Sequence, residues 1–522
     1  MDKPKFDPKE KFSKRAFGGR VRHGPPHIVV RLTRELEPYE DGERFEQERL
    51  RSWPELAALW KKVLARSGQA RLRPLFRSLS PVELKRLVAS ARCCSHRARY
   101  APAPFLAYFQ IVGGPRADLL GILAELKADR KVVALAYVEQ VGLPPGVNPI
   151  PRPSEPGLEH QFYLKQAPSK ADWLGGIDAV YAWGANGGMG GDGAGVRIID
   201  IEQGWFRGHP DFPLPRPALL AGESVRSSTE HGTAVLGVLS AQDRDDGQGG
   251  IGIVPHVASI DCVSYVDALD QYCEAAAANP AAAITFAAAR LAAGDVMLIE
   301  ATLYEPDLDP PAPGGTNPDL MFPIEANEAN RAAIELAVAH GITVVEPGGN
   351  GTDPRDGTGC GDPPLDMDAW PRLDPADPAY ADCGAIMVSA AVVSSSDPPM
   401  QFSWSPRGRR IDCFAHGQGV YTTTCIPPLN MPADCSTTGY AGGYSPPAFG
   451  GTSAAAAIVA GAAAAIQGLA LAKFGVPLHP NQVRAMLRDR NPNTPVYDEW
   501  GNGTVVGVMP DLRRILNGYL GL

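Results

Sequence analysis

The chain has 522 residues, of which 44% are hydrophobic and 20% charged, with 56 glycines and 50 prolines. These proportions are ordinary for a globular protein, and the length allows two or three domains with many turns. Apolar runs of 18 or more residues are all interrupted, so the sequence predicts no membrane-spanning helix and no membrane partner.

The net charge of −9 is divided unevenly along the chain. Residues 1–100 carry a balance of +12, and residues 101–522 carry −21. A nucleic-acid surface is one interpretation of such a basic region, but few aromatic residues are interleaved with the basic ones. We therefore expect no nucleic-acid partner, and we expect the basic N-terminal region to dock on the acidic remainder of the same chain.

The N-terminal region alternates predicted strands and helices. Strands are expected at residues 27–32, 105–112 and 132–141, and helices at residues 53–65, 81–91 and 117–127. Ser80, followed three residues later by Glu83, is typical of a capping box at the start of a helix. The pattern predicts a small α+β domain over residues 1–141, followed by a proline-rich linker at residues 142–160.

From residue 161 onward, apolar strands alternate with helices of small residues. The expected strands are residues 196–200, 260–263, 296–300, 342–345 and 385–392, and the main helices are residues 281–292 and 328–340. This rhythm predicts an α/β fold, with a parallel sheet flanked by helices, over residues 161–522. The glycine-rich run at 187–195 precedes a strand, whereas phosphate loops follow one, so we expect it to be a surface connection.

Ser453 lies between a Gly450-Gly451 pair and a long run of small helix formers. A serine at the start of a helix is usually an N-cap. The same position also suits a nucleophile, because the free N–H groups of a helix N-terminus stabilise a developing oxyanion.

A serine nucleophile needs a base and a group that orients the base. His231, at the start of an apolar helix, is the expected base. Asp200 ends the strand at residues 196–200, and a buried carboxylate is costly unless it is paired. We therefore expect Asp200 to hold the imidazole of His231.

Together these segments resemble the subtilisin-like serine proteases, the subtilase family. The matching motifs are Ile199-Asp200 with Gly208-His209-Pro210, His231-Gly232-Thr233, Gly348-Gly349-Asn350 and Gly451-Thr452-Ser453. The resemblance implies the subtilisin-like fold, and a serine endopeptidase that hydrolyses polypeptide substrates through an acyl-enzyme. The chain order and roles are those of the family: Asp200, His231 and Ser453 form the triad, and Asn350 is the oxyanion donor. It also implies that the N-terminal domain is similar to the family's propeptide, which assists folding and covers the active site.

The resemblance further assigns residues 295–303 to the strand that binds substrate backbone. Glu300, Ala301, Gly348 and Gly349 are the expected substrate-binding residues. Glu300 stands where the family has a small residue, so it would either select a basic side chain or pair with an internal cation. Residues 305–324 and 353–384 look like insertions, which would either set specificity or elaborate the surface.

Two alternatives to a general endopeptidase stay open, and a third is disfavoured. A processing peptidase with one partner substrate would have the same triad. A catalytically weak binding protein could keep the fold, because a fold alone does not prove activity. A carboxylate base, as in the acid-active relatives of this fold, is disfavoured by His231 and Asn350.

No cofactor is implied by this chemistry. Residues 243–249 resemble a loop that binds calcium in some relatives, although a solvated acidic turn is the other interpretation. Nine cysteines without a C-x-x-C spacing predict no metal site, and Cys360/Cys383 and Cys425/Cys435 are the candidate disulfides. The charged N-terminus lacks the apolar segment of a secretory signal, which predicts a cytoplasmic protein or secretion by a non-standard route.

Overall fold

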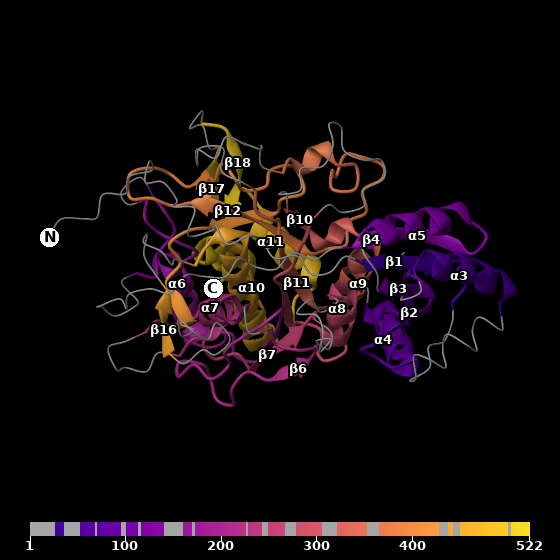
Figure 1. The fold of residues 1–522 in the computed structure, drawn as a ribbon. Helices are drawn as coiled ribbons and strands as arrows, with labels where there is room; N and C mark the ends of the chain where they lie inside the picture. Colours follow the sequence, from indigo (N-terminus) through magenta and orange to yellow (C-terminus); the bar gives the residue numbers. More distant parts are fainter. Residues whose placement is uncertain are drawn as a thin grey trace.

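The computed structural model contains a small N-terminal sheet and a large sheet covered by helices on both faces (Figure 1). The residues that the structure describes are 27–35, 53–67, 70–94, 101–112, 116–139, 160–169, 173–225, 228–242, 249–266, 278–304, 321–351, 365–426, 437–441, 449–498 and 503–522. The predicted linker at 142–160 lies outside this set except for His160, so the predicted domain boundaries stay predictions.

The N-terminal sheet is antiparallel, with the strand order β2-β3-β1-β4. Its strands are β1 (His27–Leu32), β2 (Arg71–Pro74), β3 (Tyr108–Val112) and β4 (Val133–Glu139). Its helices are α3 (Pro54–Arg66), α4 (Pro81–Cys94) and α5 (Arg116–Ala128). Ser80 and Glu83 exchange hydrogen bonds through Ser80 N–H to Glu83 Oε2 and Glu83 N–H to Ser80 Oγ, which is the capping box expected at α4.

The large sheet has the order β18-β17-β13-β12-β11-β8-β5-β7-β6 among its described strands, and β14 also pairs with β12. The run from β12 to β6 is parallel throughout. The strands are β5 (Arg197–Glu202), β6 (Leu219–Ala221), β7 (Ser259–Ser264), β8 (Val296–Ile299), β11 (Thr343–Pro347), β12 (Ile386–Val392), β13 (Met400–Gln401), β14 (Cys413–His416), β17 (Thr494–Tyr497) and β18 (Val505–Met509). The predicted α/β fold with a parallel, helix-flanked sheet is confirmed.

Helices cover both faces of the large sheet, because its parallel strands bury apolar side chains on each side. One face packs against α6 (Ala179–Gly184), α7 (Thr229–Ser240), α10 (Gly451–Phe474), α11 (Pro480–Arg488) and α12 (Leu512–Ile515). The other face packs against α8 (Pro280–Ala288) and α9 (Glu328–Ala339). Two hairpins, β9 (Thr302–Tyr304) with β10 (Met321–Pro323) and β15 (Thr422–Ile426) with β16 (Thr437–Ala441), complete the described strands.

Among the described helices, α10 alone is long and apolar enough to span a membrane, and 94% of its most apolar window is buried inside the protein. Such a helix fits the core of a globular domain as well as a membrane, and here it packs against β12, β11 and α7.

The N-terminal sheet lies against α8 and α9, as Figure 1 shows on its right side. One apolar cluster joins Phe76 and Leu84 of the N-terminal region to Phe286 of α8 and Ala332 of α9. The Glu139 carboxylate at the end of β4 accepts hydrogen bonds from the side-chain amides of Asn327 (3.0 Å) and Asn330 (2.9 Å) at the start of α9. A buried carboxylate there is favoured by the helix dipole as well as by these donors.

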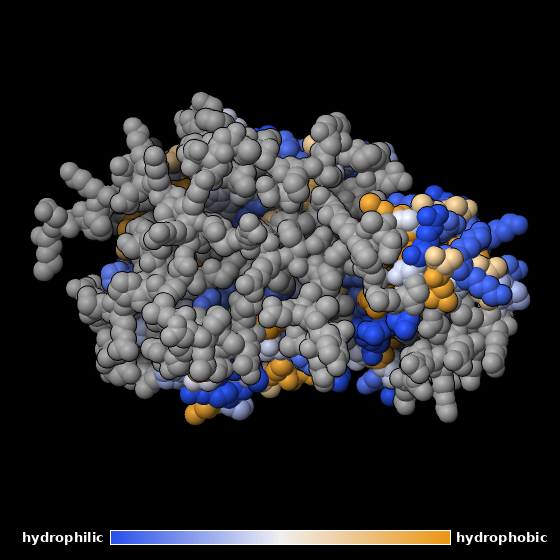
Figure 2. Space-filling view, in the orientation of Figure 1, coloured by the Kyte–Doolittle hydropathy of each residue, from blue (hydrophilic) through white to orange (hydrophobic). Residues whose placement is uncertain are grey.

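Hydrophilic and hydrophobic side chains lie intermixed over the N-terminal elements at the right of the space-filling view in Figure 2. At the interface between the N-terminal region and helices α8 and α9, the described residues form apolar contacts and buried hydrogen bonds. One ion pair, Arg31 to Glu328 at 3.4 Å, accompanies them. The contacts are therefore mainly apolar and hydrogen-bonded rather than electrostatic.

Candidate active site

Side chains from β5, α7, α10 and the end of β8 meet at the carboxyl edge of the parallel sheet, where ligands of α/β folds usually bind. Side chains alternate along a strand, so Asp200 and Glu202 of β5 share one face, while Ile199 and Ile201 belong to the core on the other face. The face with the two carboxylates is the one that α7 and α10 cover. These helices carry His231 and Ser453 in their first turns.

The imidazole of His231 is held by Glu202. Nδ1 of His231 forms a short hydrogen bond with Oε1 of Glu202, and both side chains are buried. The ring of Phe449 packs edge-on against the imidazole, with 5.4 Å between ring centroids. The imidazole is thus fixed by a carboxylate on one side and by an aromatic ring on another.

Asp200, which the sequence predicted as this partner, contacts a different side chain. Its Oδ2 accepts a hydrogen bond from the indole Nε1 of Trp205 at 2.7 Å, and its Oδ1 has no hydrogen bond to a described residue. The difference has a geometric cause, because Glu202 lies one same-face position closer to the carboxyl end of β5 and has the longer side chain. The strand alternation and the acidic residue at 202 were visible in the sequence and made Glu202 a second candidate, but they did not decide between the two.

Trp205 and Gly232 fit together behind the site. A Cβ atom added at Gly232 would lie 2.5 Å from Cδ1 of Trp205 and 2.4 Å from the Gly204 carbonyl oxygen. Glycine at position 232 therefore allows α7 to approach the segment after β5, which brings His231 within reach of Glu202.

Ser453 is partly exposed at the start of α10, next to the loop that carries Asn350. The side-chain oxygen of Asn350 accepts hydrogen bonds from the backbone N–H (2.9 Å) and the hydroxyl (3.0 Å) of Thr452. The amide group of Asn350 is thereby oriented, and its Nδ2 donates no hydrogen bond to a residue that the structure describes. No hydrogen bond joins Ser453 to His231 within the described part of the chain, and such bonds are often long before substrate binds.

The four predicted substrate-binding residues lie in the segments that directly follow β8 and β11. Glu300 and Ala301 follow β8 and are each 3% exposed. Gly348 donates its N–H to the Val388 carbonyl at 2.8 Å. Gly349 has φ = +100°, and a Cβ atom there would lie 2.2 Å from the Met321 carbonyl oxygen, so only glycine fits.

The site is rich in buried acids. Burial raises the pKa of Asp200, and the nearby Glu202 raises it further. Burial also raises the pKa of Glu202. For His231, burial lowers the pKa to about 4, and the negative charge of Asp200 opposes this shift. The imidazole is therefore neutral, and able to accept a proton, at neutral pH.

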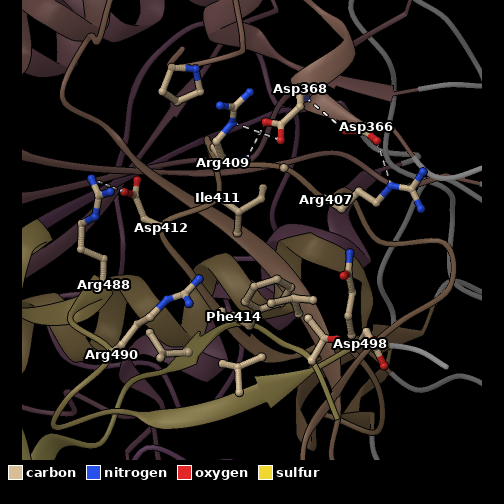
Figure 3. A pocket seen from close by; sticks show the side chains of 18 residues that line it. Asp366, Asp368, Arg407, Arg409, Ile411, Asp412, Phe414, Arg488, Arg490 and Asp498 are labelled. Carbon is tan, nitrogen blue, oxygen red and sulfur yellow. Dashed lines mark hydrogen bonds and ion pairs between the residues drawn. The ribbon is translucent and has the colours of Figure 1, made fainter. Parts of the chain in front are cut away.

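A separate cavity of about 720 Å³ lies between the C-terminal strands and residues 366–411 and contains none of the predicted site residues. Figure 3 shows that its arginines and aspartates pair with one another: Arg407 with Asp366, and Arg409 with Asp368. Its charges are largely balanced by these pairs. Because none of the predicted site residues lines the cavity, it is distinct from the site around Ser453.

Glu325, Glu346 and Cys383 are close enough to hold a metal ion by distance alone. However, both carboxylate oxygens of Glu325 accept hydrogen bonds from the guanidinium of Arg410, at 2.5 and 2.7 Å. The group is thus organised around a buried arginine, and no metal site is assigned to it.

Three further predictions involve residues that lie partly or wholly outside the described part of the chain. The possible calcium loop at 243–249 lies outside them except for Gly249. Cys383 is a free thiol, so the predicted Cys360/Cys383 disulfide is wrong. Cys425 is disulfide-bonded, to a partner outside the described residues.

The sequence was compared with the models of known protein families. The model of the subtilase family matches residues 219–503, which include His231, Glu300, Asn350 and Ser453 but not β5. No protein with a curated description matches the sequence.

Three solved structures are similar to this chain at low identity. Fervidolysin from Fervidobacterium pennivorans, a keratinolytic enzyme, is 18% identical, with a TM-score of 0.48 over 95% of this chain and 61% of that chain. A cold-adapted subtilisin-like serine proteinase is 18% identical, with a TM-score of 0.37 over 61% of this chain and 90% of that one. The MycP3 protease of a type VII secretion system is 18% identical, with a TM-score of 0.42 over 70% of this chain and 94% of that one.

The chain thus spans about three fifths of the fervidolysin structure. Because the family model covers more than half of its length, the chain belongs to the subtilase family, a family of serine peptidases.

Proposed function

We propose that this protein is a serine endopeptidase whose triad is Ser453, His231 and Glu202. The observation that carries this assignment is the short hydrogen bond between His231 Nδ1 and Glu202 at the sheet edge where α10 presents Ser453. Glu202 takes the role that the sequence analysis predicted for Asp200, because it is the carboxylate in contact with the imidazole.

In the proposed reaction, Ser453 attacks the peptide carbonyl and forms an acyl-enzyme. His231 accepts the serine proton through Nε2 and then donates it to the leaving amine. The Nδ1–H of His231 donates to Glu202, which fixes the tautomer and stabilises the imidazolium. Water then hydrolyses the ester by the same proton path. The chemistry uses groups of the chain itself and requires no cofactor.

The oxyanion is proposed to be held by Nδ2 of Asn350 and the backbone N–H of Ser453. The orientation of the Asn350 amide by Thr452 supports this role, since the oxygen is already occupied and the nitrogen carries the remaining donors. Removal of such a donor costs about 10²–10³-fold in turnover, a value known from subtilisin itself.

The N-terminal α+β region is proposed to act as a propeptide-like domain. Its sheet packs on α8 and α9, and Glu139 caps the start of α9 through Asn327 and Asn330. These contacts support intramolecular docking, although the interface is less charged than the +12 and −21 balances suggested.

Localisation also stays a proposal. The disulfide at Cys425 favours an oxidising compartment over the cytoplasm. Fractionation of the native host, followed by blotting for this chain, tests the choice.

The test of the function is covalent labelling by a fluorophosphonate probe, with the Ser453→Ala variant as the control. We expect the probe to label the wild-type chain and not the variant, and peptide hydrolysis to disappear with the label. A folded wild-type chain that neither reacts with the probe nor cleaves a peptide library would favour a binding protein. Cleavage of a single sequence in that library would favour a dedicated processing peptidase.

A further inference from the structure

Glu300 lies directly behind the proposed nucleophile. Its N–H donates to the Ile201 carbonyl at 2.9 Å, one residue past the paired Ile299 and Ile201. Glu300 therefore stands beside Glu202, at the same edge of the sheet. Its side chain is 3% exposed, and neither carboxylate oxygen has a hydrogen bond of ordinary geometry to a described residue.

The groups that face Glu300 are two carboxyl groups and two hydroxyl groups. Asp200 and Glu202 face it from β5, the phenol of Tyr265 faces it from the end of β7, and Ser453 faces it from α10. Burial raises the pKa of Glu300, and Glu202 and Asp200 raise it further. The Ser453 hydroxyl, acting as a hydrogen-bond donor, opposes this shift. No cation acts on Glu300 from the described residues, so pairing with an internal cation is not supported.

These surroundings also argue against Glu300 as a receptor for basic substrate side chains. A carboxyl group that is 3% exposed offers little surface to a substrate, and a carboxylate beside two other buried acids is costly. Among the groups that face Glu300, the hydroxyl of Ser453 is the one with a hydrogen-bonding interaction with its carboxyl group.

We propose that Glu300 is a positioning residue whose protonated carboxyl group directs the Ser453 hydroxyl toward His231. With its proton in place, Glu300 donates its O–H to the Ser453 oxygen, and the serine proton is left for Nε2 of His231. Without that proton, the Glu300 carboxylate accepts the hydrogen bond of the Ser453 hydroxyl and competes with His231 for it. This inference rests on the proposed function of Ser453.

The consequence is a loss of nucleophilicity at alkaline pH. Each pH unit above the pKa of Glu300 reduces its protonated fraction about tenfold. The reactivity of Ser453 should therefore fall on the alkaline side, although the neutral imidazole remains available there. Glutamine at position 300 keeps an N–H donor toward Ser453 and cannot titrate. Alanine also cannot titrate, but it has no donor toward Ser453.

The first test measures the rate of fluorophosphonate labelling across pH for the full chain and for Glu300→Gln and Glu300→Ala. We expect an alkaline fall in the wild-type chain, no alkaline fall in Glu300→Gln, and a lower rate throughout in Glu300→Ala. The same alkaline fall in the wild type and the glutamine variant would overturn the proposal. Equal labelling of wild type and Ser453→Ala would instead overturn the proposed nucleophile.

The second test needs no activity. Infrared difference spectra between the wild type and Glu300→Gln isolate the carbonyl stretch of a protonated Glu300. We expect this band at neutral pH, and we expect it to shift in Ser453→Ala, which removes the hydroxyl partner. Absence of the band, or a band that Ser453→Ala leaves unchanged, would show that Glu300 does not act on Ser453.

Discussion

Nδ1 of His231 is bonded to Glu202, while Asp200, two residues earlier on the same face of β5, accepts a hydrogen bond from Trp205. One strand therefore presents two buried carboxylates to the site, and only one of them orients the imidazole. The two acids can be separated experimentally because each has a neutral isostere of nearly the same shape.

Glu202→Gln should lower kcat by about 10⁴-fold, the size known for the orienting carboxylate of subtilisin, because the imidazole loses its anionic partner. Asp200→Asn is the matched control and should change kcat by less than about tenfold, since it does not touch His231. Steady-state hydrolysis of one peptide by both variants decides the assignment. A larger loss in Asp200→Asn would return the triad role to Asp200.

Peptidase activity should persist to unusually acid pH. Burial lowers the pKa of His231 to about 4, so the imidazole stays neutral and competent as a base above that pH. The acid limb of the labelling rate should therefore lie near pH 4 rather than near the ordinary imidazole value of about 6.5. An acid limb at or above the ordinary value would show that the Glu202 charge outweighs burial.

The sequence predicted the fold class because apolar strands and small-residue helices alternate with clear spacing, as at residues 296–300 and 328–340. It also predicted that His231, Asn350 and Ser453 gather at one edge, which the structure shows. It could not choose between Asp200 and Glu202, because both satisfy the strand pattern, and the choice depends on how far α7 reaches toward β5. That reach depends on the packing of Gly232 against Trp205, a contact between segments that sequence spacing does not specify.

The role of Glu300 also could not be predicted from the sequence. The sequence indicated an acidic residue in the wall of the substrate site. Two interpretations were open: selection of a basic substrate side chain, or pairing with an internal cation. Its burial and its acidic neighbours depend on the register between β8 and β5, which pairs Ile299 with Ile201. Only the three-dimensional arrangement brings Glu300 against Ser453.

Arg410→Ala should destabilise the fold by about 3–5 kcal/mol, because it leaves buried carboxylates without their partner. The Arg410 side chain is fully buried and bonds Glu325 through two nitrogens and Asp412 through a third. Urea unfolding measures the change. Arg66→Ala, which removes the exposed ion pair with Glu125, is the control and should have little effect. Similar midpoints for the two variants would mean that the buried cluster contributes no more than a surface pair.

Glu139→Ala should loosen the N-terminal sheet from α9. Glu139 accepts from both Asn327 and Asn330, so the variant leaves two buried amides without their acceptor. Hydrogen exchange of the β1 and β4 amides in the full chain should quicken, whereas the exposed Glu125→Ala control should leave it unchanged. Because the interface is mainly apolar, 1 M salt should have a smaller effect than Glu139→Ala. Release by salt alone would support the electrostatic docking expected from the charge balance.

Asp200→Asn should stabilise the fold increasingly as pH rises. Burial and Glu202 raise the pKa of Asp200, so the folded state binds more protons than the unfolded state above the ordinary value of about 3.9. The slope of stability with pH is then negative: the contribution of this group is complete below that value and is lost as pH approaches the raised folded pKa. Asparagine does not titrate and keeps an oxygen for the Trp205 indole, so it escapes this loss. Thermal unfolding of both proteins from pH 4 to 9 should show midpoints that diverge with pH, with the variant higher. Parallel curves would mean that Asp200 is ionised in the folded protein, stabilised by a partner other than Trp205.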